Sequence, residues 1–225
     1  MMKKGAEANL YLEPFSIQLH PFGEGRVVIK HRVSKRYRVR ELDFRLREAR
    51  TSLEASLLAD AKRAGVFVPT VYEVDRKNMR IVMEHVEGEQ VKTVLERLDE
   101  EERWKLCRTI GRCIARLHRS GIIHGDLTTS NMVLTPDGQV YLVDFGLGEY
   151  DRSVESRGVD LHLLKRALQS VHFRVAERAY REVLSGYARE FGEGSSEVIR
   201  RVEEIERRGR YVGRENRGTV LRHRK

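Results

Sequence analysis

A short polar segment followed by a predicted hairpin most constrains how this chain of 225 residues can fold. The segment His124–Asn131 reads His-Gly-Asp-Leu-Thr-Thr-Ser-Asn, and Asp144–Gly146 reads Asp-Phe-Gly. Between them, apolar runs at 132–134 and 140–143 flank a Pro-Asp-Gly turn, which is typical of a hairpin. If the hairpin is symmetric about its Asp-Gly pair, Asn131 and Asp144 lie opposite each other, roughly 4.5–5.5 Å apart.

These residue types suit phosphate chemistry. Magnesium takes carboxylate and amide oxygens, needs few protein ligands and shares its other positions with water and phosphate. We therefore predict Asn131 and Asp144 as metal ligands. Asp126 lies just upstream, where it can accept a proton from, or orient, an attacking hydroxyl or water. Asp-Phe-Gly alone is common by chance, and a lone histidine such as His124 is more often structural. The combination at this spacing predicts a phosphotransfer site.

The order of predicted elements indicates an α+β fold with two lobes and a cleft. Alternating and β-branched runs predict strands, and apolar residues at helical spacing predict helices, one of which starts with a capping pattern at Asp99 and Glu102. We expect a strand-rich N-terminal lobe over 1–86, a helical lobe over 87–208 and a flexible basic tail over 209–225. The predicted strands are 15–20, 26–30, 71–74 and 79–84, and the predicted helices are 43–64, 99–119 and 158–208.

The two motifs together resemble the catalytic and metal motifs of the protein kinase superfamily. The resemblance implies that Lys30, at the end of a strand, holds the α/β-phosphates of ATP and that Glu54 is its ion-pair partner. Read alone, Glu54 would be a surface carboxylate on a highly charged helix. The backbone around Glu84 and Val86 would hold adenine, and Gly5 would belong to the loop that covers the phosphates.

Further motifs lie at 4–8, 50–55, 84–88 and 144–161. They resemble one family more closely, the small atypical kinases of the KEOPS complex, which are archaeal and eukaryotic. The resemblance implies an atypical serine/threonine kinase or ATPase that uses ATP and Mg²⁺ and supports threonylcarbamoyladenosine synthesis on tRNA. It also implies a cytoplasmic location and two protein partners, a larger transferase subunit and a small accessory subunit.

The chain departs from ordinary kinases in ways that predict a minimal fold. The phosphate loop has one glycine, Gly5, where ordinary kinases have three. Gly125 replaces the arginine that in many kinases grips a phosphorylated activation loop. Fifteen residues separate Asp144 from Asp160, which matches the buried aspartate of the next helix, and they contain no Ala-Pro-Glu motif. We therefore expect no activation segment that could seat a peptide.

Charge is concentrated in two zones. The chain has 43 Lys and Arg against 34 Asp and Glu, a net charge of +9. Residues 26–50 have ten basic against three acidic residues, and residues 200–225 have ten against four. Such zones suit a polyanion, here tRNA bound within the complex, although a solvated surface or contacts with acidic proteins give the same pattern. No known RNA-binding module is recognised.

Other classes remain open or are disfavoured. A stand-alone serine/threonine kinase, or a small-molecule kinase of the RIO or aminoglycoside type, shares part of the motif set. A non-catalytic scaffold would not need these catalytic groups, so their presence disfavours that class. No apolar run reaches the length of a membrane span, so no membrane contact is expected. Cys107 and Cys113 are too few for a disulfide framework or a zinc site and are expected to be buried thiols in a reducing cytosol.

Overall fold

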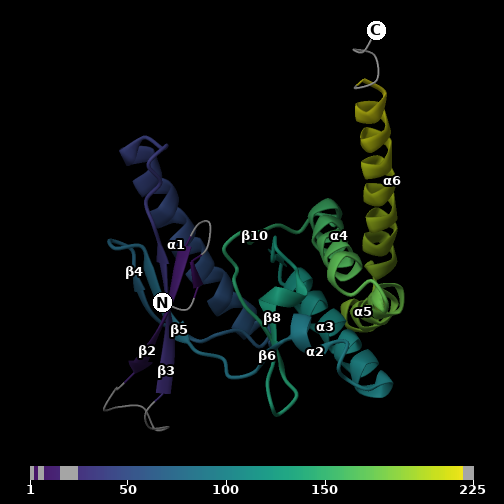
Figure 1. Ribbon diagram of the computed structural model, residues 1–225, viewed down its shortest axis with the longest axis horizontal. Helices are drawn as coiled ribbons and strands as arrows, with labels where there is room; N and C mark the ends of the chain where they lie inside the picture. Colours follow the sequence, from purple (N-terminus) through teal and green to yellow (C-terminus); the bar gives the residue numbers. More distant parts are fainter. Residues whose placement is uncertain (1–2, 5–7, 16–24, 220–225) are drawn as a thin grey trace.

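The computed structural model describes residues 3–4, 8–15 and 25–219, with side chains described for 8–14 and 26–208. A strand-rich N-terminal part, crossed by the long helix α1, lies beside a helical C-terminal part (Figure 1). This mixed arrangement confirms the predicted α+β fold class. Gly5 and the predicted strand residues 16–20 lie outside the described residues.

The N-terminal sheet has five strands in the order β1-β2-β3-β5-β4, and every neighbouring pair is antiparallel. In the middle of the sheet, Lys30 of β3 pairs with Leu10 of β2 and Ile81 of β5. Because side chains alternate along a strand, Lys30 and Arg32 project from the same face of β3. The strands are β1 (Lys3–Lys4), β2 (Ala8–Phe15), β3 (Gly25–Arg32), β4 (Val71–Asp75) and β5 (Arg80–Glu84).

Helix α1 (Arg40–Arg63) corresponds to the predicted helix at 43–64. Its first turn carries acidic residues and its last turn basic ones, which suits the helix dipole. Leu57, Leu58 and Ala61 form its buried face, and Glu54 is buried on the same helix. The helix therefore buries the Glu54 carboxylate one turn before its apolar residues Leu57 and Leu58.

The helical part is built around helices α3 (Glu100–Arg119) and α5 (Ala176–Phe191), which pack against each other. The predicted capping pattern is confirmed, because the Asp99 side chain accepts a hydrogen bond from the Glu102 N–H at 2.9 Å. The remaining elements here are α2 (Val91–Val94), η1 (Thr129–Asn131), α4 (Val154–Val171) and α6 (Ser195–Thr219), with strands β6 (Glu89–Gln90), β7 (Ile122–Ile123), β8 (Met132–Leu134), β9 (Val140–Leu142) and β10 (Glu149–Tyr150).

The β8–β9 hairpin forms as predicted, but its predicted register is wrong by one residue. Met132 pairs with Leu142, and the Val143 N–H donates to the Asn131 carbonyl at 3.0 Å, so Asn131 faces Val143 rather than Asp144. The loop has three residues rather than two, with Gly138 at φ +82° closing a turn between paired residues 135 and 139. A left-handed glycine in the third loop position is typical of such loops and shifts the symmetry centre.

The connection after the Asp-Phe-Gly tripeptide is short, as predicted. Within the described stretch 145–153, the only regular element is β10, which pairs antiparallel with β7, and α4 begins directly afterwards at Val154. The Ser153 side chain caps α4 by accepting from the Ser156 N–H. The chain thus passes from Asp144 to α4 without an extended segment.

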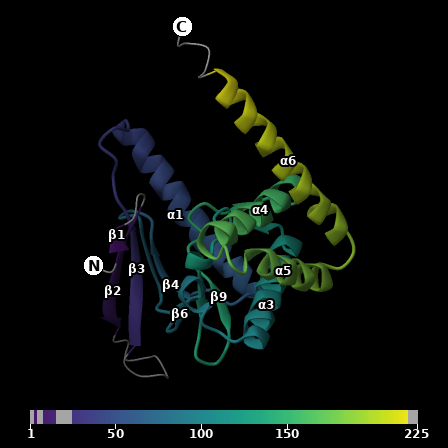
Figure 2. The same ribbon diagram turned by 45° about the vertical axis from the view of Figure 1, so that its right-hand side comes forward.

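A helix occupies most of the stretch for which the sequence predicts no regular structure. Helix α6 continues through residues 209–219, and Figures 1 and 2 show its C-terminal half extending beyond the helical part. Its first half packs on α4 and α5. Residues 220–225 lie outside the described range. The Gly and Arg content of this stretch gives no helical pattern in the sequence, so the sequence did not predict this part of the helix.

The two cysteines are buried in α3, as expected. Burial raises the pKa of Cys107 to about 12 and that of Cys113 to about 11, so both remain protonated thiols near neutral pH. Among the residues described, no helix combines the length and apolar character that crossing a membrane requires.

Candidate active site

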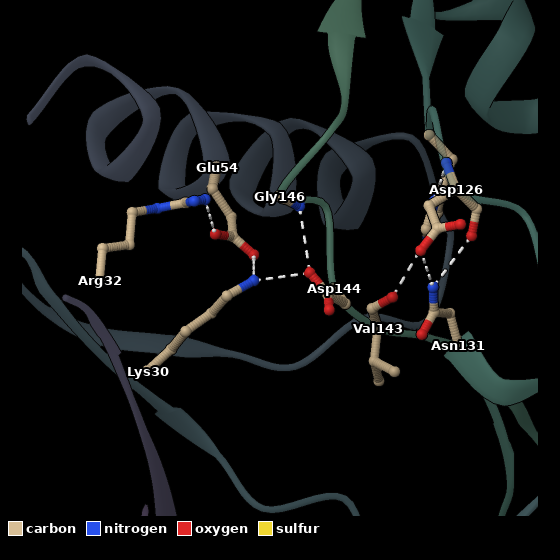
Figure 3. Close-up of polar contacts among 9 residues, drawn as sticks. Lys30, Arg32, Glu54, Asp126, Asn131, Val143, Asp144 and Gly146 are labelled. Carbon is tan, nitrogen blue, oxygen red and sulfur yellow. Dashed lines mark hydrogen bonds and ion pairs between the residues drawn. The ribbon is translucent and has the colours of Figure 1, made fainter. Parts of the chain in front are cut away.

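A buried carboxylate, Glu54 of α1, lies between two cationic side chains of β3 (Figure 3). Lys30 Nζ is 2.5 Å from Glu54 Oε1, and Arg32 Nη2 is 2.6 Å from Glu54 Oε2. The three side chains are 7%, 3% and 1% exposed for Lys30, Arg32 and Glu54. Charges so deeply buried are tolerated only when paired. The structure thus brings Lys30 and Glu54 together, as the kinase resemblance implies.

Lys30 also reaches Asp144, whose Oδ1 lies 2.6 Å from Nζ. Unlike its partners, the Asp144 side chain is half exposed to the cleft. Burial by itself raises the pKa of Asp144, but the charge and hydrogen bond of Lys30 outweigh it and hold the pKa below the usual range. Asp144 has φ +64°, a left-handed conformation that costs about 1–3 kcal/mol outside glycine. An ionised carboxylate is therefore held at one specific position on the cleft wall.

A buried aspartate of α4, Asp160, organises the loop that precedes Asp126. Its Oδ2 accepts the His124 N–H and its Oδ1 accepts the Gly125 N–H, both at 2.9 Å. The His118 imidazole lies 3.3 Å from Oδ2. Gly125 has φ +76°, and a Cβ there would lie 2.2 Å from the Leu147 carbonyl, so only glycine fits. This contact joins the loop to the chain that follows Asp144.

His124 has a structural position within the site. Its ring packs on Phe145 with centroids 4.5 Å apart, and its Nε2 lies 3.2 Å from the Val143 carbonyl. Nδ1 accepts the Asp126 N–H at 3.3 Å, so Nε2 is the donor nitrogen. Burial lowers the pKa of His124, with Asp160 opposing the shift, and the ring is neutral at pH 7. The histidine ties the loop to Val143, the residue after β9, and orients the backbone of Asp126.

Asp126 and Asn131 contact each other directly. Asn131 Nδ2 donates to the Asp126 carboxylate at 2.8 Å and to the Asp126 carbonyl at 3.0 Å. Because the amide nitrogen faces Asp126, the amide oxygen points away from it (Figure 3). An oxygen so directed is a suitable ligand for a hard cation. Asn131 therefore links the residue proposed to handle the proton with a position fit for a metal.

A cavity of about 370 Å³ lies between the sheet and the helical part. Lys30, Glu54, Asp144, Glu84 and Val86 are among the residues that line it. Its volume is in the range of small-molecule and cofactor sites. The Glu84 carboxylate accepts two hydrogen bonds from Thr70, at 2.9 Å from the backbone N–H and 2.7 Å from the hydroxyl. The Glu84 side chain is thus hydrogen-bonded within the protein, which agrees with a predicted adenine contact through the backbone rather than the side chain.

Arg32 is the one charged residue of this cluster that sequence reasoning missed. The signal was present, because Arg32 follows Lys30 by two residues in a predicted strand and must share its face. Alternation alone does not reveal burial, which depends on α1 covering that face. Gly5, also predicted at the site, lies outside the described residues.

The bilobal fold, the cavity and these charged residues define a kinase-type phosphotransferase. The protein kinase domain family matches residues 24–177. Such domains use ATP with a divalent metal ion. "KEOPS complex subunit Bud32" of Pyrococcus abyssi is 53% identical over 212 residues, which cover 94% of this chain and 96% of that protein.

Two other relatives give the same result. "Probable serine/threonine-protein kinase BUD32 homolog" of Archaeoglobus fulgidus is 45% identical over 192 residues, 85% of this chain and 92% of that protein. "Probable bifunctional tRNA threonylcarbamoyladenosine biosynthesis protein" of Methanobrevibacter smithii is 40% identical over 212 residues, 94% of this chain but 37% of that longer protein. The chain belongs to the Bud32 family of atypical serine/threonine protein kinases.

Proposed function

We propose that this chain turns over ATP with Mg²⁺ as a subunit of a KEOPS assembly and thereby supports threonylcarbamoyladenosine modification of tRNA. The observation that carries the proposal is the buried Lys30–Glu54 pair joined to Asp144 at the wall of the cavity. The names of the relatives supply the assembly and the modification.

We assign each site residue a role. Lys30, held by Glu54, contacts the phosphates of ATP, and the backbone at Glu84 and Val86 holds adenine. Asp126 orients the attacking hydroxyl or water and accepts its proton. Gly5 is proposed to belong to the loop over the phosphates.

The residues present fit a magnesium ion. Asp144 is ionised and half exposed to the cleft, and the Asn131 amide oxygen is turned away from its hydrogen-bonded partner. We propose these two oxygens as the protein ligands, since magnesium needs few of them. When bound, the ion neutralises charge on the phosphates during transfer.

A conventional peptide substrate fits the chain poorly. The described residues 145–153 hold only the short strand β10 before α4 begins, which leaves little backbone to seat a peptide. We therefore propose hydrolysis of ATP, or phosphorylation of the chain itself or of a bound partner, rather than phosphorylation of free proteins.

A second catalytic unit is proposed as a neighbour. In the Methanobrevibacter smithii relative, the matching region is about a third of a chain named bifunctional. Fusion of two units in one chain favours their working side by side.

We propose a transferase subunit and a small accessory subunit as partners, with tRNA phosphates contacting the basic zones at 26–50 and 200–225. We also propose a cytoplasmic location, and lobe boundaries at 1–86 and 87–208.

Co-purification with a tagged chain tests the assembly. The expected result is recovery of a transferase subunit and tRNA, and a higher rate of ATP turnover when the purified transferase is added back. In parallel, a peptide library tests whether the isolated chain phosphorylates free peptide substrates. Efficient phosphorylation of a clear peptide consensus by the isolated chain would contradict the proposal.

A further inference from the structure

Glu54 is held by two cations, whereas the roles assigned above require only Lys30. We propose that Arg32 is a positioning residue for ATP turnover. It fixes Glu54 so that Lys30 keeps its place when nucleotide and metal occupy the cleft. The inference rests on the proposed ATP site, and its test includes a variant that distinguishes failure of the inference from failure of the ATP site.

The two cations divide the carboxylate between them. Lys30 donates to Oε1 and Arg32 donates to Oε2, so neither oxygen can rotate away without losing a partner. Arg32 is only 3% exposed, and water competes little for its guanidinium. A Cβ on Gly146 would lie 3.0 Å from Asp144 Oδ1, 3.2 Å from Lys30 Nζ and 3.4 Å from Arg32 Nη2. Asp144, Lys30 and Arg32 therefore meet beside one backbone position.

Glu54 shares the Lys30 ammonium with Asp144 before any ligand binds. When Lys30 turns toward phosphates, Glu54 must share it with the ligand while remaining buried. A buried carboxylate without sufficient counter-charge is strongly disfavoured. Arg32 lies on the far oxygen of Glu54 and supplies a positive charge that does not depend on the ligand.

A second contact fastens the same point of β3 to α1. Arg47 of α1 donates to the Arg32 carbonyl at 3.3 Å and to the Asp43 carboxylate at 2.7 Å. Helix α1 is thus joined to the Arg32 position through both the side chain and the backbone. From the described stretch 145–153, Tyr150 donates to Asp60 near the other end of α1, far along the helix from Arg47. The brace is built into the strand that carries Lys30.

The test measures kcat and KM for ATP in the full-length chain, together with its melting temperature. Arg32→Met and Arg32→Lys are each made in the parent and in the Glu54→Gln variant. Arg45→Met is the matched control. Arg45 of α1 also pairs with a carboxylate, that of Glu41 at 2.8 Å, but its side chain is 75% exposed. Lys30→Met in the same assay checks the ATP site itself.

We expect Arg32→Met to lower kcat by roughly tenfold or more, because small displacements of a positioned group have large effects on rate. KM for ATP should change much less, since adenine and metal contacts are untouched. Arg32→Lys should lie between Arg32→Met and the parent, because an ammonium cannot reproduce the fork geometry. In the Glu54→Gln variant, Arg32→Met should change kcat by less than about twofold.

Parental kcat in Arg32→Met, or equal losses in both backgrounds, would overturn the proposal. If Arg32→Met does not fold, Arg32→Lys decides by the same comparison: a loss in the parent alone supports the proposal, and parental kcat or equal losses overturn it. An inactive Lys30→Met beside a fully active Arg32→Met rejects this inference alone. An active Lys30→Met rejects the ATP site.

Discussion

The two halves of the site are built in opposite ways. On the sheet side, ion pairs centred on Lys30 join side chains from elements far apart in sequence. On the helical side, the loop 124–131 is held by backbone N–H groups that donate to one buried carboxylate, Asp160. The first half places charges for chemistry, and the second fixes the path of a loop.

This difference divides activity from stability. Glu54 is paired with both Lys30 and Arg32, so removal of Lys30 leaves this buried carboxylate with one cation. Backbone donors left unsatisfied in the interior destabilise the fold directly. Loss of Lys30 should therefore reduce turnover with little unfolding, and substitutions on the helical side should reduce stability. The predictions below test that division, from the largest effect to the smallest.

Lys30→Met should lower ATP turnover by roughly 10²–10³-fold, since one positioned charge on the reacting phosphates is lost. Its apolar stem is retained, and Arg32 still neutralises Glu54, so the melting temperature should fall by only a few degrees. Steady-state kinetics and thermal denaturation measure both. Lys92→Met on the surface is the control. A large drop in stability with little change in rate would reverse the comparison.

Asp160→Asn should lower the free energy of unfolding by about 2–3 kcal/mol, because an amide cannot accept from both backbone donors as the carboxylate does. Urea denaturation measures the change, with Glu101→Gln, at an exposed position of α3, as control. Unchanged stability accompanied by lost turnover would assign Asp160 to the chemistry instead.

The buried histidines should make stability fall as the pH is lowered. Burial lowers the pKa of His118 and of His124, so both are neutral when folded but take up protons near pH 6.5 when unfolded. The unfolded state then binds more protons, and stability is lost below about pH 6.5, with a limiting slope of about 1.4 kcal/mol per pH unit for each histidine. Urea denaturation between pH 7.5 and 5.5 measures the slope, which should be smaller in His124→Asn. An identical slope in that variant would contradict the assignment.

Tyr150→Phe should have the smallest effect. The Tyr150 hydroxyl donates to Asp60 at 2.6 Å and ties β10 to the C-terminal end of α1, but both side chains are partly exposed. Loss of such a bond should cost less than about 1 kcal/mol of stability and leave kcat within about twofold of the parent. Chemical denaturation and the same turnover assay measure the two values. A tenfold loss of kcat would mean that the position of α1 depends on this tie rather than on the Glu54 cluster.

Much of the site could be predicted because its residues sit in strongly patterned elements. Lys30 ends a β-branched run, and Glu54 lies on a long periodic helix. The hairpin register could not be predicted, because Gly138 in a left-handed conformation adds a third loop residue and moves Asn131 opposite Val143. Propensity does not separate two-residue from three-residue loops when both contain Asp-Gly.

The other differences arise from tertiary context. Arg32 follows Lys30 at strand spacing, but its burial depends on α1 lying over that face. The stretch 209–219 contains glycines that lower helix propensity, yet α6 continues through it. Helix α6 packs on α4, and tertiary packing rather than propensity supplies most of the stability of such helices.

The most direct test of the ATP–metal assignment is Asp144→Asn in a reconstituted modification assembly, with ATP turnover and threonylcarbamoyladenosine on tRNA measured in the same samples. Glu87→Gln, an exposed residue paired with Arg26, is the control. We predict that Asp144→Asn folds, joins the assembly and loses both activities by roughly 100-fold or more. Turnover and modification within a few-fold of the parent would contradict the account.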